Sequence, residues 1–403
     1  MGLVMLVENP ADAYDRTCDS STVHDATHLN WKGANSLITP PESRRPSQVH
    51  FKTQDKQDSS PEQLVESVSS FSYFIDHDNL LEGVASVIAH FFPAWNVSRD
   101  VKFIQCTAGI TNKLVRCLHQ PTGESALVRC YGKGSDILID RRQEMLNLIA
   151  LSRLGLSPAL YGRFHNGLVY GYVEGVPFSV EDMHHPRKSL LVAEQLARWH
   201  RVDLPGEPRV PKLFSTLWRW LDAVPATYSN SSADRKFKAS LNMDELKEDL
   251  RQLQNVLEKL NSPVTFCHND LLSGNIVYDQ TRDSVSFIDY EYGNYSYRGF
   301  DIGNHFCEHA GFDCDWSLYP TKSFQLGWLR EYLQSFTGSD AVSTDEVETL
   351  YKEVAKFSLA SHFYWAVWAL VQAEISDLDF DYLEYALMRL REYRRRRDEV
   401  LAL

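Results

Sequence analysis

The stretch Phe266-Cys-His-Asn-Asp-Leu-Leu-Ser-Gly-Asn-Ile-Val277 decides how this 403-residue chain folds. It sets His268, Asp270 and Asn275 in the spacing H-x-D-x-x-x-x-N. A second acid, Asp289, follows 19 residues after Asp270, at the end of an apolar run that is typical of a strand. An isolated His-x-Asp pair carries little information. This spacing, followed by such an acid, is the layout of a kinase catalytic loop and its metal-binding residue.

Each of these residue types suits one part of phosphoryl transfer. The reaction needs a carboxylate that holds the attacking hydroxyl, and oxygen ligands that hold Mg²⁺ on the phosphates. Asp270 is therefore predicted to be catalytic, while Asn275 and Asp289 are predicted to bind Mg²⁺. We expect Asp289 to be the stronger ligand because it carries a full charge. Glu291, two residues further on, is either a group beside the metal or a surface acid.

Two other residues are expected to shape this loop. His268 is expected to pack and form hydrogen bonds that hold the loop, without taking part in the chemistry. Asp301, within Phe300-Asp-Ile-Gly, is expected to brace the backbone of the loop, and the alternative for Asp301 is a helix N-cap.

The order of the expected elements divides the chain into three parts. Residues 8 to about 70 are polar and lack periodicity, so we expect residues 1–73 to form a disordered or partly ordered extension, of which residues 1–70 can be deleted without loss of folding or activity. Residues 74–175 are expected to form a small β-rich lobe, and residues 176–403 a larger, mostly helical lobe, which together make an α+β fold. In the small lobe we expect strands at 101–107, 113–119, 125–131, 160–164 and 168–173, and helices at 80–92 and 139–154.

Composition limits the partners of the protein. The formal net charge is −13 and the pI is near 5.5, so the basic footprint of a nucleic-acid-binding protein is missing. The seven cysteines are irregularly spaced, which favours reduced thiols in the cytoplasm. No signal peptide is recognisable at the start of the sequence. The most apolar stretch, residues 357–373, is too short to span a bilayer comfortably and suits a buried helix.

Two longer runs resemble one known family. They are Asp289-Tyr-Glu-Tyr-Gly-Asn-Tyr-Ser-Tyr-Arg-Gly-Phe-Asp-Ile-Gly-Asn-His-Phe and Ser361-His-Phe-Tyr-Trp-Ala-Val-Trp-Ala-Leu-Val-Gln-Ala. Both resemble the signatures of the choline/ethanolamine kinases, and the resemblance covers roughly residues 75–395. The catalytic stretch and Asp315-Trp-Ser-Leu-Tyr-Pro are more similar to the ethanolamine kinases of this family.

The resemblance implies a bilobal, protein-kinase-like fold and a reaction. The γ-phosphoryl group of ATP, bound with Mg²⁺, would pass to the hydroxyl of ethanolamine, which is the first step of phosphatidylethanolamine synthesis by the CDP-ethanolamine route. A choline kinase, or a kinase with both activities, is the alternative. Kinases of this family often form homodimers, but the sequence shows no self-evident interface.

The resemblance also implies residues for the nucleotide. Gly109, Thr111 and Asn112 stand where a loop would bind the phosphates, although an ordinary hairpin turn is the alternative. Arg129 stands where protein kinases carry a lysine, and a guanidinium can bind phosphate through two hydrogen bonds. Glu144, on the next expected helix, would pair with Arg129.

A third implied site would hold the ammonium group of the substrate. Trp365 and Trp368 are three residues apart on an expected helix and share a face, and Tyr385 follows on the next helix. Aromatic faces attract cations. Glu308 and Asp313 are the candidate carboxylates, and an acid favours a primary ammonium because it has N–H groups to donate.

Overall fold

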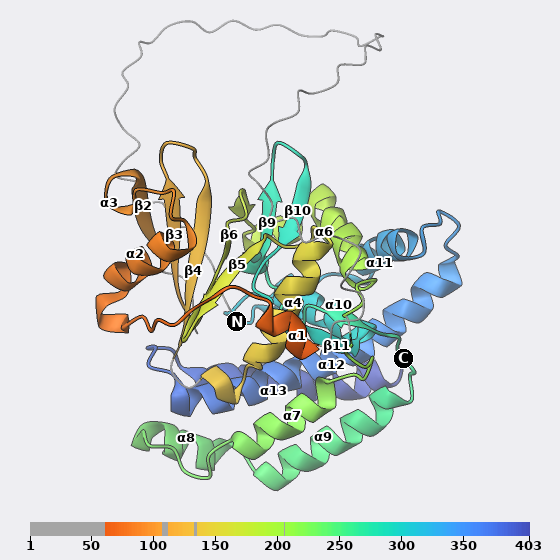
Figure 1. Ribbon diagram of the computed structural model, residues 1–403. Helices are drawn as coiled ribbons and strands as arrows, with labels where there is room; N and C mark the ends of the chain where they lie inside the picture. Colours follow the sequence, from red (N-terminus) through yellow and green to blue (C-terminus); the bar gives the residue numbers. More distant parts are fainter. Residues whose placement is uncertain (1–60, 107–111, 133–134, 205) are drawn as a thin grey trace, which may run out of the picture. The chain divides into compact units, whose positions relative to one another are not determined.

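The computed structural model describes residues 61–106, 112–132, 135–204 and 206–403. The small lobe is built on a six-stranded sheet with the strand order β1-β5-β6-β4-β3-β2 (Figure 1). Its strands are antiparallel except for the β1–β5 pair. Their bounds are β1 (Ser70–Phe71), β2 (Val101–Cys106), β3 (Asn112–His119), β4 (Ser125–Tyr131), β5 (Leu160–Phe164) and β6 (Gly167–Gly171).

Alternating side chains of this sheet serve two different faces. Val128 and Val169 pack with helix α2 (Leu80–Phe91), whereas Leu168, next to Val169, packs with helix α4 (Arg141–Arg153). Leu127, next to Val128, belongs to a separate apolar group with Leu114. Because successive side chains of a strand point to opposite faces, one face of the sheet packs in the core of the small lobe and the other face is directed toward the rest of the chain.

Two short strand groups surround the predicted catalytic stretch. β8 (Val264–Cys267) pairs with β11 (Asn294–Tyr297), and β9 (Ile276–Asp279) lies between β7 (Val176–Pro177) and β10 (Ser284–Phe287). Residues 268–275 connect β8 to β9 and end in a 3-10 turn, η4 (Ser273–Asn275). The catalytic stretch is thus held at both ends by a ladder of backbone hydrogen bonds.

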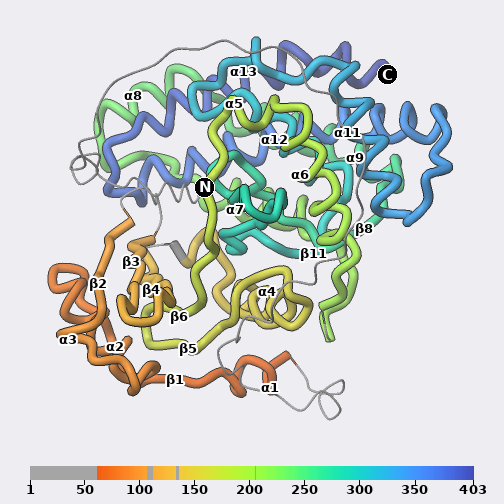
Figure 2. Tube along the Cα trace, turned by 90° about the horizontal axis from the view of Figure 1, so that it is seen from above, coloured from red at the N-terminus to blue at the C-terminus, as the bar shows by residue number. Residues whose placement is uncertain are grey.

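The larger lobe is organised around one long helix, α12 (Thr344–Ile375), which packs against α10 (Arg298–Glu308) and α13 (Tyr382–Leu401). Gly303 of α10 lets the two helices approach closely, because a Cβ at this position would lie 2.9 Å from the backbone of Val354 and Ser358. Figure 2 shows α12 and α13 together on one side, away from β2–β6. The other helices of this lobe are α5 (Val180–Met183), α6 (Pro186–Trp199), α7 (Leu213–Ala223), α8 (Ser231–Ser240), α9 (Met243–Glu258) and α11 (Lys322–Thr337).

The expected elements of the small lobe are present within about two residues at each end, and the expected larger lobe is mostly helical. The apolar stretch 357–373 lies inside α12 and is almost entirely buried, as expected. Among the described residues, no helix has the length and apolar character needed to cross a bilayer. The domain boundaries themselves stay predictions.

The end of the predicted extension is ordered, which is one of the two expected alternatives, but its helix and strand were not predicted. Residues 61–71 include helix α1 (Pro61–Glu66) and strand β1, which pairs with β5. Leu64 is 2% exposed and lies beside Leu146 and Ile149 of α4. The expectation that residues 1–70 can be removed without loss does not agree with this packing. Residues 1–60 lie outside the described part of the chain.

Replacing Leu64 tests whether α1 is part of the folded lobe. We expect Leu64→Ala to lower the free energy of unfolding by about 2–3 kcal/mol, because a buried leucine leaves a cavity when it is truncated. Leu81→Ala is the matched control, since Leu81 is 47% exposed on α2 and its loss should cost less than about 0.5 kcal/mol. Urea unfolding of both variants measures the difference. Equal, small effects would mean that α1 contributes nothing to stability.

Candidate active site

The carboxylate of Asp301 holds the start of the catalytic loop. Asp301 lies in the first turn of α10 and is fully buried. Its Oδ2 accepts a hydrogen bond from the backbone N–H of His268 at 2.8 Å, and its Oδ1 accepts one from the N–H of Asn269 at 2.7 Å. His200 Nε2 lies 3.0 Å from Oδ2. Burial alone would raise the pKa of Asp301, but the hydrogen bond and charge of His200 and the backbone donors lower it.

Helix α10 holds the next residues of the loop in the same way. Asn304 donates a side-chain hydrogen bond to the carbonyl of Asn269, and His305 Nδ1 donates to the carbonyl of Leu271 at 2.9 Å. Asn269 itself has a left-handed backbone, with φ of 63°, which asparagine tolerates better than most residues. His268 Nε2 lies 3.0 Å from the carbonyl of Ile288. Hydrogen bonds from side chains of α10 therefore hold several backbone groups of the loop from His268 to Leu271.

Asp270 projects from this fixed loop as a buried carboxylate. Burial raises its pKa to about 8, and the negative charges of Asp289, Glu308 and Glu291 act in the same direction. The side-chain amide of Asn275 donates to the carbonyl of Asp270 at 2.8 Å and to its Oδ2 at 3.2 Å. A carboxyl group with a pKa near neutrality is suited to accept a proton from a hydroxyl.

Asn275 and Asp289 have the donor atoms that Mg²⁺ prefers. The Oδ1 atom of Asn275 is buried and accepts no hydrogen bond from the described residues. Asp289 follows β10 with a left-handed backbone, φ of 64°, and burial raises its pKa to about 6. A buried amide oxygen left without a donor, near a buried carboxylate, fits a hard divalent cation.

Two arginines pair with a group of buried acids near Asp289. Arg129 of β4 lies 3.0 Å from Glu144 and 3.1 Å from Asp289, and it also pairs with Glu291. The expected pairing of Arg129 with Glu144 is therefore present. Glu291 is 4% exposed, so it is not a surface acid. Arg141 of α4 pairs with Glu144 at 3.1 Å, and the sequence analysis did not single it out.

Asn112 is the one residue of the predicted phosphate loop that the structure describes. Its amide donates to Oε2 of Glu291 at 3.0 Å, so it lies within the same group of charges. Gly109 and Thr111 lie outside the described residues, and their predicted role stays a prediction.

A pocket lies between the small sheet and the strands of the larger lobe. The connection from β6 to β7 forms one wall through Gly171, Tyr172 and Val173, and Arg129 and Asp289 lie at its polar end. Apolar walls beside a chain connection suit the base of a nucleotide. The apolar side chains that line it are Leu114, Leu127, Leu148, Pro158, Val277 and Ile288.

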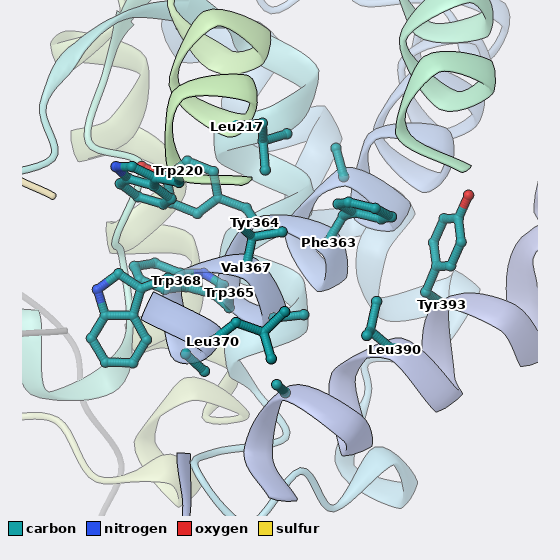
Figure 3. Packing of buried hydrophobic residues seen from close by; sticks show 14 of the residues in the cluster. Leu217, Trp220, Phe363, Tyr364, Trp365, Val367, Trp368, Leu370, Leu390 and Tyr393 are labelled. Atoms are coloured by element: carbon teal, nitrogen blue, oxygen red, sulfur yellow. The ribbon is translucent and has the colours of Figure 1, made fainter. Parts of the chain in front are cut away.

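Trp365 and Trp368 lie in the core of the larger lobe, where α10, α12 and the catalytic stretch meet. Both are fully buried, and their rings are 5.6 Å apart (Figure 3). Trp365 Nε1 donates to Oδ1 of Asn304 at 2.7 Å, and Trp368 Nε1 donates to the hydroxyl of Tyr292 at 2.9 Å. Asn304 also donates to the loop, so one asparagine links the tryptophans to the catalytic backbone.

The other three residues predicted for the ammonium site have different surroundings. Tyr385, in the first turn of α13, is fully buried and its ring lies 6.0 Å from that of Phe312. Glu308, the last residue of α10, is buried and pairs with Arg389 of α13. Asp313 is exposed in the turn that follows α10. The structure thus brings Glu308 and Tyr385 together through Arg389, and it leaves Asp313 at the surface.

Comparison with known proteins agrees with this geometry. A family model for choline/ethanolamine kinases matches residues 103–394. The chain belongs to the choline/ethanolamine kinase family. A probable ethanolamine kinase A of Dictyostelium discoideum is 38% identical over 344 residues, which are 84% of this chain and 98% of that protein. Ethanolamine kinase 2 of Homo sapiens is 40% identical over 340 residues, 84% of this chain and 86% of that protein.

Solved structures of this family share the fold. An ethanolamine kinase of Plasmodium vivax is 28% identical, with a TM-score of 0.71, and the match covers 85% of this chain and 95% of that one. A choline kinase of Cryptosporidium parvum is 22% identical, with a TM-score of 0.65, and the match covers 80% of this chain and 96% of that one. The predicted bilobal, protein-kinase-like fold is confirmed.

Three residues of this family member escaped the sequence analysis. Tyr292 lies in the run after Asp289, and its ring is 5.5 Å from Trp365. An aromatic residue one step beyond Glu291 was a signal that could have been used. Arg141 and Arg389 gave no such signal, because an arginine on an amphipathic helix usually indicates a solvated face.

The buried histidines under the loop predict a dependence of stability on acid. Burial lowers the pKa of His305 and of His268 to about 4, whereas the unfolded chain binds these protons near pH 6.5. The unfolded state therefore binds more protons between these values, and stability should fall as the pH drops from about 6.5 to about 4.

The variant His305→Gln should lose one of these protons. We expect the slope of unfolding free energy against pH in this range to be shallower than in the unmodified protein by about 1.4 kcal/mol per pH unit. Urea unfolding at pH 7, 6, 5 and 4.5 measures both slopes. Parallel lines would show that His305 is protonated equally in both states.

Proposed function

We propose that this protein is an ethanolamine kinase, which transfers the γ-phosphoryl group of ATP to the hydroxyl of ethanolamine and releases phosphoethanolamine and ADP. The observation that carries the proposal is the buried carboxylate of Asp270 on a loop whose backbone is fixed by Asp301. The relatives named above as ethanolamine kinases, at about 40% identity over most of the chain, support the choice of substrate.

Asp270 would receive the proton of the substrate hydroxyl. Its pKa of about 8 in the free protein makes it a stronger base than an exposed aspartate, and the hydrogen bond from Asn275 keeps its Oδ2 oriented. Because the carboxylate is buried, bulk water has little access to compete with the hydroxyl as the acceptor of the phosphoryl group. The rigid loop keeps the attacking oxygen in one place.

Asn275 and Asp289 would hold Mg²⁺, through the amide oxygen and the carboxylate. When it is bound, Mg²⁺ neutralises negative charge on the phosphates. Arg129 would bind the phosphate groups through its fork of N–H donors, with Glu144 keeping the guanidinium in position. The apolar pocket beside residues 171–173 would take the adenine.

The ammonium group would be held by aromatic rings and one carboxylate. Tyr292, Trp365, Trp368 and Tyr385 supply the rings, and Glu308 supplies the charge. A primary ammonium can donate hydrogen bonds to a carboxylate, whereas the quaternary ammonium of choline has none to donate. Asp313 is exposed, so it is a weaker candidate for this contact. A cytoplasmic location and a homodimer stay predictions from the sequence.

Removing the carboxylate of Asp270 tests the catalytic assignment. We expect Asp270→Ala to lower kcat by at least about a hundredfold, because the group that orients and deprotonates the hydroxyl is lost. The affinity for ATP should persist, since Asp270 faces the acceptor. Asp283→Ala is the control at an exposed aspartate, and should keep full activity. Release of ADP and binding of a fluorescent ATP analogue measure the two effects; near-normal turnover by Asp270→Ala would exclude this base.

A panel of amino-alcohols tests the choice of substrate. We expect kcat/KM for ethanolamine to exceed that for choline by at least about tenfold, with monomethylethanolamine between them. The reason is that one lost hydrogen bond to a charged group costs about 1.5–3 kcal/mol. ADP release at saturating ATP gives the three ratios. A preference for choline would move the assignment to a choline kinase and would leave the catalytic loop unaffected.

A further inference from the structure

Arg389 is an arginine in the interior of the protein. It lies on α13 and is 1% exposed, whereas Arg391, on the same helix, has a side chain that is 63% exposed. Removing a guanidinium from water is costly unless the protein supplies partners. Such a residue therefore needs an explanation in its contacts.

The contacts of Arg389 lead to two residues already proposed for the ammonium site. Its Nη2 pairs with Oε1 of Glu308, at the end of α10, and its Nε donates to the hydroxyl of Tyr385 at 3.0 Å. The guanidinium also lies over the rings of Tyr385 and Trp316, at 5.3 and 5.5 Å from their centres. The arginine thus joins an acid from one helix to an aromatic residue from another.

The pairing with Arg389 uses only one of the two carboxylate oxygens of Glu308. Arg389 uses Oε1, and no described residue donates a hydrogen bond to Oε2 of Glu308. A carboxylate can accept hydrogen bonds on both of its oxygens at once. The Nη1 atom of Arg389 is buried and has no hydrogen-bond partner among the described residues. The contacts that hold the guanidinium are therefore those with Glu308, with the hydroxyl of Tyr385 and with the rings around it.

We propose that Arg389 is a positioning residue of the ammonium site, which fixes the carboxylate of Glu308 and the ring of Tyr385 so that Oε2 can accept an N–H of the substrate. The proposal rests on the proposed phosphorylation of an amino-alcohol. Arg389 does not touch the substrate in this arrangement; it acts through the two groups that do. Its effect should therefore appear in the KM for the amino-alcohol and not in the KM for ATP.

The experiment compares three single variants by steady-state kinetics with ethanolamine and ATP varied separately. Arg389→Met keeps the length of the side chain and removes every hydrogen bond. We expect it to raise the KM for ethanolamine at least about tenfold, with less than a threefold change in kcat and in the KM for ATP. Arg389→Lys keeps the charge, and should recover part of the loss because a lysine can still pair with Glu308. Arg391→Met, exposed on the same helix, should leave kcat and both KM values unchanged.

A double variant shows whether Arg389 acts through Glu308. In Glu308→Gln the charge that Arg389 holds is already absent, so adding Arg389→Met should raise the KM for ethanolamine by less than threefold more. If Arg389→Met is unfolded by circular dichroism, the Arg389→Lys variant and its combination with Glu308→Gln decide the question in the same way.

Several results would overturn the proposal. One is an unchanged KM for ethanolamine in Arg389→Met, or in Arg389→Lys if only that variant folds. Another is a loss of kcat together with a rise of both KM values, which is the result expected of a purely structural arginine. Independent effects of the two substitutions would also overturn it. A failure of the proposed function can be recognised separately. In that case the unmodified protein does not phosphorylate ethanolamine, and this is measured before any variant is made. A preference for choline would overturn the proposed hydrogen bond to Oε2 as well, because a quaternary ammonium has no N–H to donate.

Discussion

The site depends on one carboxylate that accepts hydrogen bonds from two consecutive backbone N–H groups. Asp301 bonds the N–H groups of His268 and Asn269, and without it both donors would be buried and unsatisfied. The same acid pairs with His200, whose Nδ1 lies 2.6 Å from the hydroxyl of Tyr332 on α11. The loop is therefore part of a network that reaches through α6, α10 and α11, and such networks are stable only when every member is satisfied.

The second constraint is charge. Asp270, Asp289, Glu291, Glu144 and Glu308 are all buried or nearly buried, in a site that must receive the highly negative phosphates of a nucleotide. Internal arginines pair with these acids: Arg129 and Arg141 lie at the end of the site proposed for the nucleotide, and Arg389 pairs with Glu308 at the end proposed for the ammonium. An arginine suits this task because its planar fork can bond two acids at once and it stays charged when buried.

Much of this could be predicted because the informative residues are close together in the chain. Asp270, Asn275 and Asp289 lie within 20 residues, and the strands around them have clear apolar periods. The pairings that could not be predicted join distant residues, as Arg389 joins Glu308 across 81 positions and Arg129 joins Asp289 across 160. No local pattern tells a buried arginine from an exposed one. Helix α1 escaped because its six residues have one buried side chain and no repeat.

The length of helix α10 also sets a distance within the proposed substrate site. Asp301 near one end holds the loop that carries Asp270, and Glu308 at the other end is the acid proposed for the ammonium. Seven residues of α-helix separate them by about 10 Å, and the hydrogen bonds of the helix keep this length constant. Gly303 lets the helix lie close against the backbone of α12. The length of α10 would then determine the distance between the amine and the hydroxyl of an accepted amino-alcohol. A protein that phosphorylated a longer amino-alcohol would need a change in this helix more than a change in the residues of the pocket.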